Sequence, residues 1–192
     1  KNELKFTESV SFKGYDEKDV IILSVLASRE EDQDPIDSAI ITKAKESKDL
    51  EKNLSTFKIM DFKPFDPVVK RTEATIKDSK GNIFKVSKGA PQVILSLISK
   101  DKDIAKSLDE NVNSFASKGY RALGVAKTDS KGKWKYVGLV ALYDPPRDDS
   151  AETIKNAQSM GVTVKMVTGD HVAIAKEISK QVGLRSNVVT AS

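Results

Sequence analysis

The chain has 192 residues, of which 32 are Lys or Arg and 28 are Asp or Glu, and it contains no cysteine. The absence of cysteine excludes a disulfide, a thiol nucleophile and a cysteine-ligated metal site, and the single histidine, His171, argues against a histidine-rich metal site. Lysines and acids are interspersed, and basic runs with interleaved aromatic residues are absent. We therefore expect no nucleic-acid partner, despite the formal net charge of +4.

No apolar run in the sequence approaches the roughly 18 residues that a membrane-spanning helix needs. The chain begins at Lys1, without an initiator Met or an apolar signal region. We therefore expect a piece of a longer protein, large enough for a sizeable core.

The first elements in chain order are predicted to be helices. Residues 16–28 open with an acidic turn and carry apolar side chains near helical spacing. A second helix is expected from Pro35, because proline is well tolerated in the first helical turn and an apolar stripe follows it.

From residue 57 the pattern favours strands, at residues 57–62, 71–77 and 82–87. Asp78 and Gly81 predict a hairpin turn at 78–82, because glycine tolerates positive φ and aspartate caps turns. Helices are predicted at 92–99 and 104–117, the second ending at Gly119, and strands at 121–128 and 133–143.

After residues 144–147 the pattern changes to α/β. A helix is expected from Asp149 or Ser150 to Met160, with Glu152 completing a capping box. A buried strand is expected at 162–167, then a tight turn and a helix at 171–182. The fold class is thus α+β with an antiparallel sheet over residues 1–143, followed by an α/β segment over 148–192, with a hinge at 144–147.

Three groups of residues could carry chemistry. Lys88-Gly89-Ala90-Pro91 lies between a strand and a helix, where the glycine would let a ligand approach and the lysine would meet a phosphate. Phe65 could be a stacking platform for a base. The alternatives are a solvated lysine and a core phenylalanine ring.

The third group, Thr168-Gly169-Asp170, follows a predicted buried strand, so that a hydroxyl, an amide and a carboxylate could face a phosphoryl group. The alternative is that Asp170 merely caps the next helix. The Walker pattern is absent from the sequence, so an ATP site must be of another kind.

Six short motifs occur in an order and spacing that resemble the large cytoplasmic loop of the P-type cation-transporting ATPases. The sequence of residues 27–37 is similar to that of the plasma-membrane proton pumps in particular. The motifs are Asp34-Pro35-Ile36-Asp37-Ser38-Ala39, Pro64-Phe65-Asp66-Pro67, Lys88-Gly89-Ala90-Pro91, Gly119-Tyr120-Arg121-Ala122-Leu123, Asp144-Pro145-Pro146-Arg147 and Met166-Val167-Thr168-Gly169-Asp170.

The resemblance implies that residues 1–143 form a nucleotide-binding domain, which is a twisted antiparallel sheet flanked by helices. It implies that residues 148–192 are part of a haloacid-dehalogenase-like phosphorylation domain. It implies that Phe65 stacks on adenine, Lys88 lines the pocket floor and Asp37 approaches the adenine amino group. Basic side chains near the phosphates would be Lys70, Lys127 and Arg121, and Thr168, Gly169 and Asp170 would contact the transferred phosphoryl group. The implied ligands are ATP and, in the full pump, Mg²⁺, and the implied partners are the actuator and transmembrane domains of the same plasma-membrane protein.

Two departures from the family pattern limit what the chain can do alone. The sequence lacks both Asp-Lys-Thr-Gly-Thr, which holds the phosphorylated aspartate, and the later Gly-Asp-Gly-x-Asn-Asp magnesium motif. We therefore expect the chain to bind ATP without turning it over, and we expect no metal site in it. A pump for magnesium or calcium and a non-catalytic interaction module remain alternatives, while a free-standing phosphatase would need its own nucleophilic aspartate.

Overall fold

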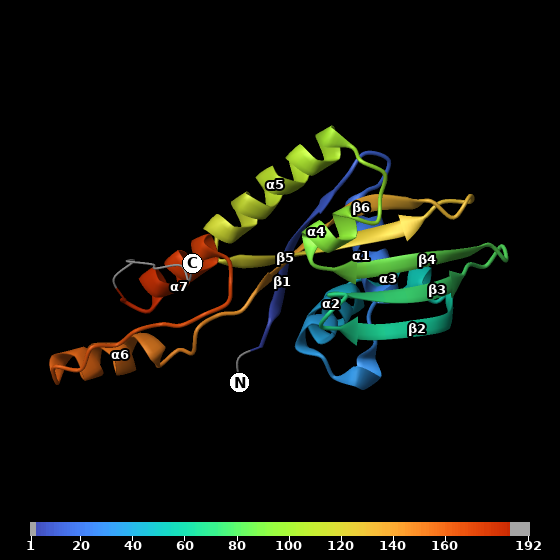
Figure 1. Cartoon of the computed structure of the whole chain (residues 1–192). Coiled ribbons are helices and arrows are strands. Elements are labelled where there is room, and N and C mark those ends of the chain that lie inside the picture. The colour runs from blue at the N-terminus through green and yellow to red at the C-terminus, as the bar shows by residue number, and fades with distance from the viewer. Residues whose placement is uncertain (1–2, 185–192) are drawn as a thin grey trace.

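A six-stranded antiparallel sheet forms the centre of the molecule in the computed structural model, which describes residues 3–184 (Figure 1). The strand order is β1-β6-β5-β4-β3-β2, so that β1 and β2 are the two edges. The strands are β1 (Lys5–Ser11), β2 (Lys58–Asp66), β3 (Arg71–Lys77), β4 (Ile83–Gly89), β5 (Tyr120–Thr128) and β6 (Trp134–Tyr143). The antiparallel sheet with flanking helices that the sequence predicts is therefore confirmed.

Helices cover the two faces of the sheet unequally. On one face, α1 (Glu17–Leu26), α2 (Pro35–Lys45) and α3 (Lys48–Leu54) enclose a core that includes Val20, Ile40, Ile76 and Val140. On the other face, α4 (Pro91–Leu95) and α5 (Lys102–Ser117) enclose a second core with Ile94, Leu108 and Leu139. In Figure 1, β2 and β3 form the end of the sheet farthest from α5.

Local sequence signals explain several of these elements. Asp34 caps α2, because its carboxylate accepts hydrogen bonds from the N–H groups of Ile36 and Asp37, and Pro35 occupies the first helical turn. The hairpin turn is confirmed: the carboxylate of Asp78 accepts three hydrogen bonds from Lys80 and Asn82, and Gly81 has φ +87°.

Three elements lie outside the sequence prediction. Edge strand β1, helix α3 and a short 3₁₀ turn, η1 (Glu30–Asp32), have no counterpart in it. The sequence pattern does not predict α3, because this helix buries only Leu50 and so lacks an apolar stripe. β2 runs beyond Phe62 to Asp66 with Pro64 inside it, which an edge strand tolerates because its outer side needs no N–H donor.

The C-terminal part departs most from the prediction. Helices α6 (Ser150–Ser159) and α7 (Val172–Gln181) are present, but the expected strand at 162–167 is wrong, because these residues form no regular element. Val162 is 54% and Val167 96% exposed. A strand needs a hydrogen-bonding neighbour, and within residues 3–184 none lies beside this segment. The partial α/β segment is thus two helices joined by an extended chain.

The expected cap of α6 is also wrong in detail. Asp149 does occupy the N-cap position, but its backbone is helical, with φ −86° and ψ −7°, and its side chain accepts no capping hydrogen bond. An N-cap side chain needs extended backbone geometry to reach the free N–H groups, so Glu152 completes no capping box. Among residues 3–184, no helix combines the length and the apolar character required to cross a lipid bilayer.

Candidate nucleotide site at one end of the sheet

The register of four neighbouring strands brings most of the predicted site residues to one end of the sheet. Asp66 of β2 pairs with Arg71 of β3, Arg71 pairs with Gly89 of β4, and Gly89 pairs with Gly124 of β5. These pairs mark the end of β2, the start of β3 and the end of β4. Phe65, Lys70 and Lys88 flank these positions, so they lie at the same level of the sheet.

Lys88 is the centre of a buried polar cluster. Its side chain is only 4% exposed, and its ammonium group forms an ion pair with the carboxylate of Asp37 and a hydrogen bond of 2.6 Å to Ser28 Oγ. Asp37 comes from the first turn of α2 and Ser28 from the chain after α1. The interpretation of Lys88 as a solvated lysine is therefore wrong.

Burial and charge act in opposite directions on this lysine. Removal from water lowers the pKa of Lys88, and the Asp37 carboxylate opposes that shift without cancelling it. A cation in this position is stable only while it keeps its partners, because an unpaired buried charge is costly. The Lys88 ammonium group and the Asp37 carboxylate thus form a fixed, buried donor and acceptor pair at the end of β4.

Backbone groups hold Asp37 and the neighbouring strand in place. The second carboxylate oxygen of Asp37 accepts a hydrogen bond of 2.8 Å from the N–H of Arg29. The hydroxyl of Thr72, on β3, donates to the carbonyl of Ala27 at 2.7 Å. The segment between α1 and α2 is therefore held in place from both sides. The structure brings Asp37 and Lys88, two of the predicted site residues, into direct contact.

A tight turn at residues 66–70 places Phe65 and Lys70 beside this cluster. The carboxylate of Asp66 accepts hydrogen bonds of 2.8 Å from the N–H groups of Val68 and Val69. The carbonyl of Lys70, which has φ +56°, accepts a hydrogen bond of 3.2 Å from the N–H of Ala90. Phe65 is 58% exposed, so it is not a core ring.

Gly89 is required by the fold itself. A Cβ atom there would collide with the carbonyl oxygen of Lys70 and the side chain of Arg71. The close approach that this glycine permits is therefore to the chain's own backbone. Its consequence for the site is that Lys70 and Lys88 can lie on adjoining strand ends.

Lys127 and Arg121 lie on opposite sides of Gly124 along β5. Arg121 lies three residues beyond Gly124 toward the site end of the sheet. Lys127 lies three residues the other way, and its ammonium group sits 4.4 Å from the ring centroid of Phe84. Arg121 is thus at the predicted end of the molecule, whereas the ammonium of Lys127 points to another part of the sheet.

The predicted Thr168-Gly169-Asp170 group is joined to the sheet by Arg121. Its guanidinium group donates to the Asp170 carboxylate at 2.9 Å and lies 3.8 Å from that of Asp144. The Thr168 hydroxyl oxygen accepts a hydrogen bond of 3.0 Å from the N–H of Asp170. Asp170 does not cap α7, because His171 occupies that position.

Within residues 3–184, no group of three Asp, Glu, His or Cys side chains lies close enough to hold a metal ion. Asp144 and Asp170 share one arginine, which occupies the position a cation would take between them. The described residues therefore do not fit a magnesium site, and no chemical step of this chain is derived through that ion.

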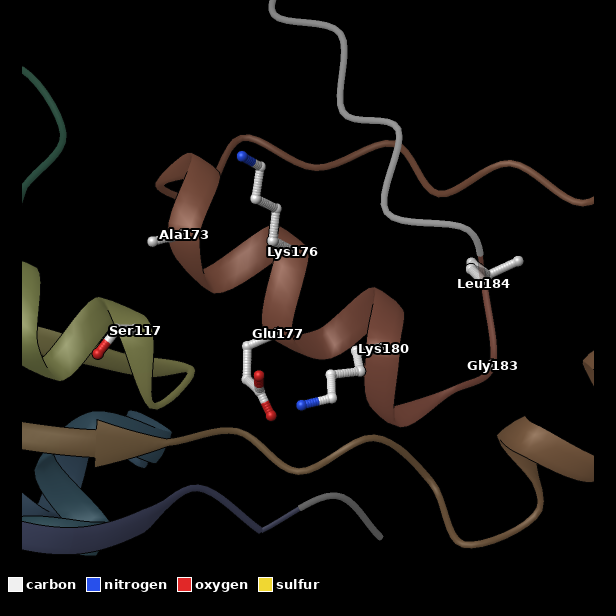
Figure 2. Close-up of a pocket in the computed structure, with 7 residues that line it drawn as sticks. All are labelled: Ser117, Ala173, Lys176, Glu177, Lys180, Gly183 and Leu184. Carbon is white, nitrogen blue, oxygen red and sulfur yellow. The ribbon is translucent and has the colours of Figure 1, made fainter.

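A hollow of about 580 Å³ lies between α5 and α7, away from all these residues (Figure 2). Figure 2 shows the side chains of Glu177 and Lys180 extending to one side of α7, with that of Lys176 pointing the other way. The residues around it are Ser117, Ala173, Lys176, Glu177, Lys180, Gly183 and Leu184. None of the predicted site residues lines it.

Sequence reasoning missed Ser28 and Thr72 as parts of the site. Ser28 is 4% exposed and Thr72 is 5% exposed, and both act through hydrogen bonds to groups distant in sequence. Ser28 lies within the stretch 27–37 that carries the resemblance, which could have indicated it. Nothing in the local sequence indicates Thr72.

Comparison of the sequence with known proteins shows the family of this chain. The model of the haloacid dehalogenase-like hydrolases matches residues 13–192. The chain is 46% identical over its whole length to "Putative cation-transporting ATPase MJ1226" of Methanocaldococcus jannaschii, of which it covers 23%. It is 36% identical over 197 aligned residues to "Plasma membrane ATPase 1" of Saccharomyces cerevisiae, of which it covers 22%. The chain thus spans less than a quarter of the length of these two relatives.

Proposed function

Because the chain belongs to the haloacid dehalogenase-like hydrolase family, and its relatives are named as ATPases, we propose that it is the ATP-binding part of a P-type cation pump. The observation that carries the proposal is the strand end described above. It combines a buried cation and carboxylate, Lys88 and Asp37, with an exposed aromatic ring, Phe65, at one level of the sheet.

The chemistry of these groups suits a nucleotide. An exposed aromatic ring offers a face on which adenine can stack, and Asp37 offers a carboxylate that can accept from the adenine amino group. Lys70, on its turn, and Arg121, at the end of β5, supply cations for the phosphates without a Walker loop. Lys88 fixes the floor of the site through its ion pair.

The chain's part in the reaction is to bind and to position. Phosphoryl transfer depends on placing the terminal phosphate in line with its acceptor, which in this proposal is an aspartate outside the 192 residues. We assign residues 1–143 to nucleotide binding, 144–147 to a hinge, and 148–192 to the part that meets the phosphoryl group through Thr168, Gly169 and Asp170. The chain alone binds ATP and does not hydrolyse it.

The transported ion is proposed to be the proton, because residues 27–37 resemble the plasma-membrane proton pumps. ATP-driven transport in vesicles that contain the full-length protein tests this point. Acidification that persists without added calcium and at constant magnesium supports proton transport, and uptake of either metal ion would assign the pump to that ion instead.

Calorimetric titration with ATP tests the binding proposal. We expect a dissociation constant of about 0.1 to a few millimolar, or about 3.5 to 5.5 kcal/mol, for a site without its partner domains. Phe65→Ala should weaken binding by roughly tenfold or more, since stacking on a base contributes about 1–3 kcal/mol. The matched control is Val68→Ala, which removes an apolar side chain that is 87% exposed on the same turn. Equal losses in both variants, or binding unaffected by Phe65→Ala, would contradict the proposal.

A further inference from the structure

The face of β2, β3 and β4 that lies opposite α1 and α2 carries a concentration of positive charge. Paired residues of antiparallel strands share a face, so the register places side chains of the three strands together. The cations on this face, named here the basic face, are Lys58, Lys63, Arg71, Lys77 and Lys85. The acids among them are Asp61, Asp66 and Glu73, so five positive charges meet three negative ones.

The cations follow the repeat of an extended chain. Arg71, Glu73, Thr75 and Lys77 mark four successive levels of β3 on this face. Each level has a cation, because Lys63 pairs with Glu73 and Lys85 with Thr75, while Arg71 and Lys77 supply their own. Alternate residues of a strand are about 6.8 Å apart, so the charges are spaced as alternate side chains of another extended chain would be.

A buried carboxylate holds three of these cations in place. Glu73 is 8% exposed and pairs with Arg71 at 2.7 Å, Lys85 at 3.2 Å and Lys63 at 3.7 Å. Although burial acts to raise the pKa of Glu73, the hydrogen bonds from Arg71 and Lys85 prevail and lower it. The Glu73 side chain is therefore charged at neutral pH and anchors the centre of the basic face.

At the end of the basic face away from Arg71, the positive charges of Lys58 and Lys77 have no acidic partner among the described residues. Lys58 and Lys77 lie directly opposite each other across β2 and β3, an arrangement that destabilises a strand pair. Neither lysine makes an ion pair within residues 3–184. The folded chain retains the repulsion between Lys58 and Lys77, and an anion bound between them would relieve it.

We propose that the basic face binds an acidic, extended protein segment whose carboxylates fall on alternate residues. Charge complementarity and the shared 6.8 Å repeat favour this occupant. The twelve positions that the register assigns to this face carry no aromatic side chain, whereas single-stranded nucleic acids need stacking platforms. Those positions are Lys58, Asp61, Lys63, Asp66, Arg71, Glu73, Thr75, Lys77, Ile83, Lys85, Ser87 and Gly89.

Fluorescence anisotropy with two labelled peptides tests this inference. One alternates glutamate and serine over eight residues, and the other has the same composition with four glutamates followed by four serines. We expect the alternating peptide to bind several-fold more tightly to the 192-residue chain. Lys58→Gln with Lys77→Gln should weaken it about fivefold, since each exposed ion pair contributes up to about 1 kcal/mol.

The control is Lys102→Gln with Lys106→Gln on α5, which lowers the net charge equally and should leave binding within about twofold. Melting temperatures of the variants should equal or slightly exceed that of the chain, because Lys58 and Lys77 are exposed and their substitution removes a repulsion between like charges.

Equal affinity of the two peptides, or equal losses in both double variants, would overturn the inference. It would also be overturned by tighter binding of an oligonucleotide or of phosphatidylserine vesicles. Self-association that requires Lys58 and Lys77 would assign the face to the exposed acidic segment at 30–34 of a second copy instead.

Discussion

The strand end around Lys88 and the segment around Asp170 carry the two halves of the proposed chemistry, and they are built very differently. Lys88, Asp37 and Ser28 are each less than 10% exposed and are joined by direct hydrogen bonds. Asp170 depends on one contact to Arg121, whose side chain is 43% exposed. The first group is thus held by several buried contacts, whereas the second is held by a single exposed ion pair.

The largest expected contrast is in amide hydrogen exchange. Val125 and Val140 lie in central strands and are fully buried, while Val162 and Val167 are in an exposed, unpaired chain. Amides of β5 and β6 should exchange at least roughly a thousandfold more slowly than those of 162–167, because their opening approaches global unfolding. Exchange rates measured by mass spectrometry check this, and similar protection in both regions would remove the contrast.

Removal of Lys88 should be costly. Lys88→Ala leaves the Asp37 carboxylate buried without its cation, which should reduce the free energy of unfolding by about 3–5 kcal/mol.

Urea denaturation measures the loss. The control Lys80→Ala, on an exposed turn, should stay within about 0.5 kcal/mol, and the double variant Lys88→Met with Asp37→Asn should recover much of the loss. A stable Lys88→Ala variant would show that water reaches Asp37.

Acid should weaken the anchor of the basic face. The pKa of Glu73 is below its ordinary value of 4.5 in the folded chain, so its contribution is present above that value and is lost as the pH falls through the folded pKa. Glu73→Gln should therefore cost about 1 kcal/mol of unfolding free energy at pH 6, after screening by solvent, and progressively less toward pH 3. A cost that stays constant over this range would show that the charge of Glu73 is not what stabilises the fold.

The smallest effect is expected at the exposed ion pair. Asp170→Asn removes the charge that meets Arg121 and should change the free energy of unfolding by less than about 1 kcal/mol, because exposed pairs contribute little. The same urea assay detects it. A loss comparable to that of Lys88→Ala would mean that the segment is as firmly built as the strand end.

Local signals in the sequence account for much of this fold. Pro35, and Asp78 with Gly81, predicted the start of α2 and the hairpin turn correctly, because a helix start and a turn with positive φ depend on a few adjacent residues. The strand at 162–167 could not be predicted correctly, because an apolar run becomes a strand only beside a partner. The family resemblance named Asp37 and Lys88 as separate site residues, whereas their ion pair and the roles of Ser28, Thr72 and Glu73 depend on register and tertiary contacts and emerge only in three dimensions.

The most direct test of the central claim is a residue-resolved NMR titration of the chain with ATP. We expect saturable shifts at Asp37, Phe65, Lys70 and Lys88, which Phe65→Ala reduces, and much smaller shifts at 162–170. Shifts confined to 162–170, or none up to about ten millimolar ATP, where even a millimolar site would be mostly filled, would contradict it.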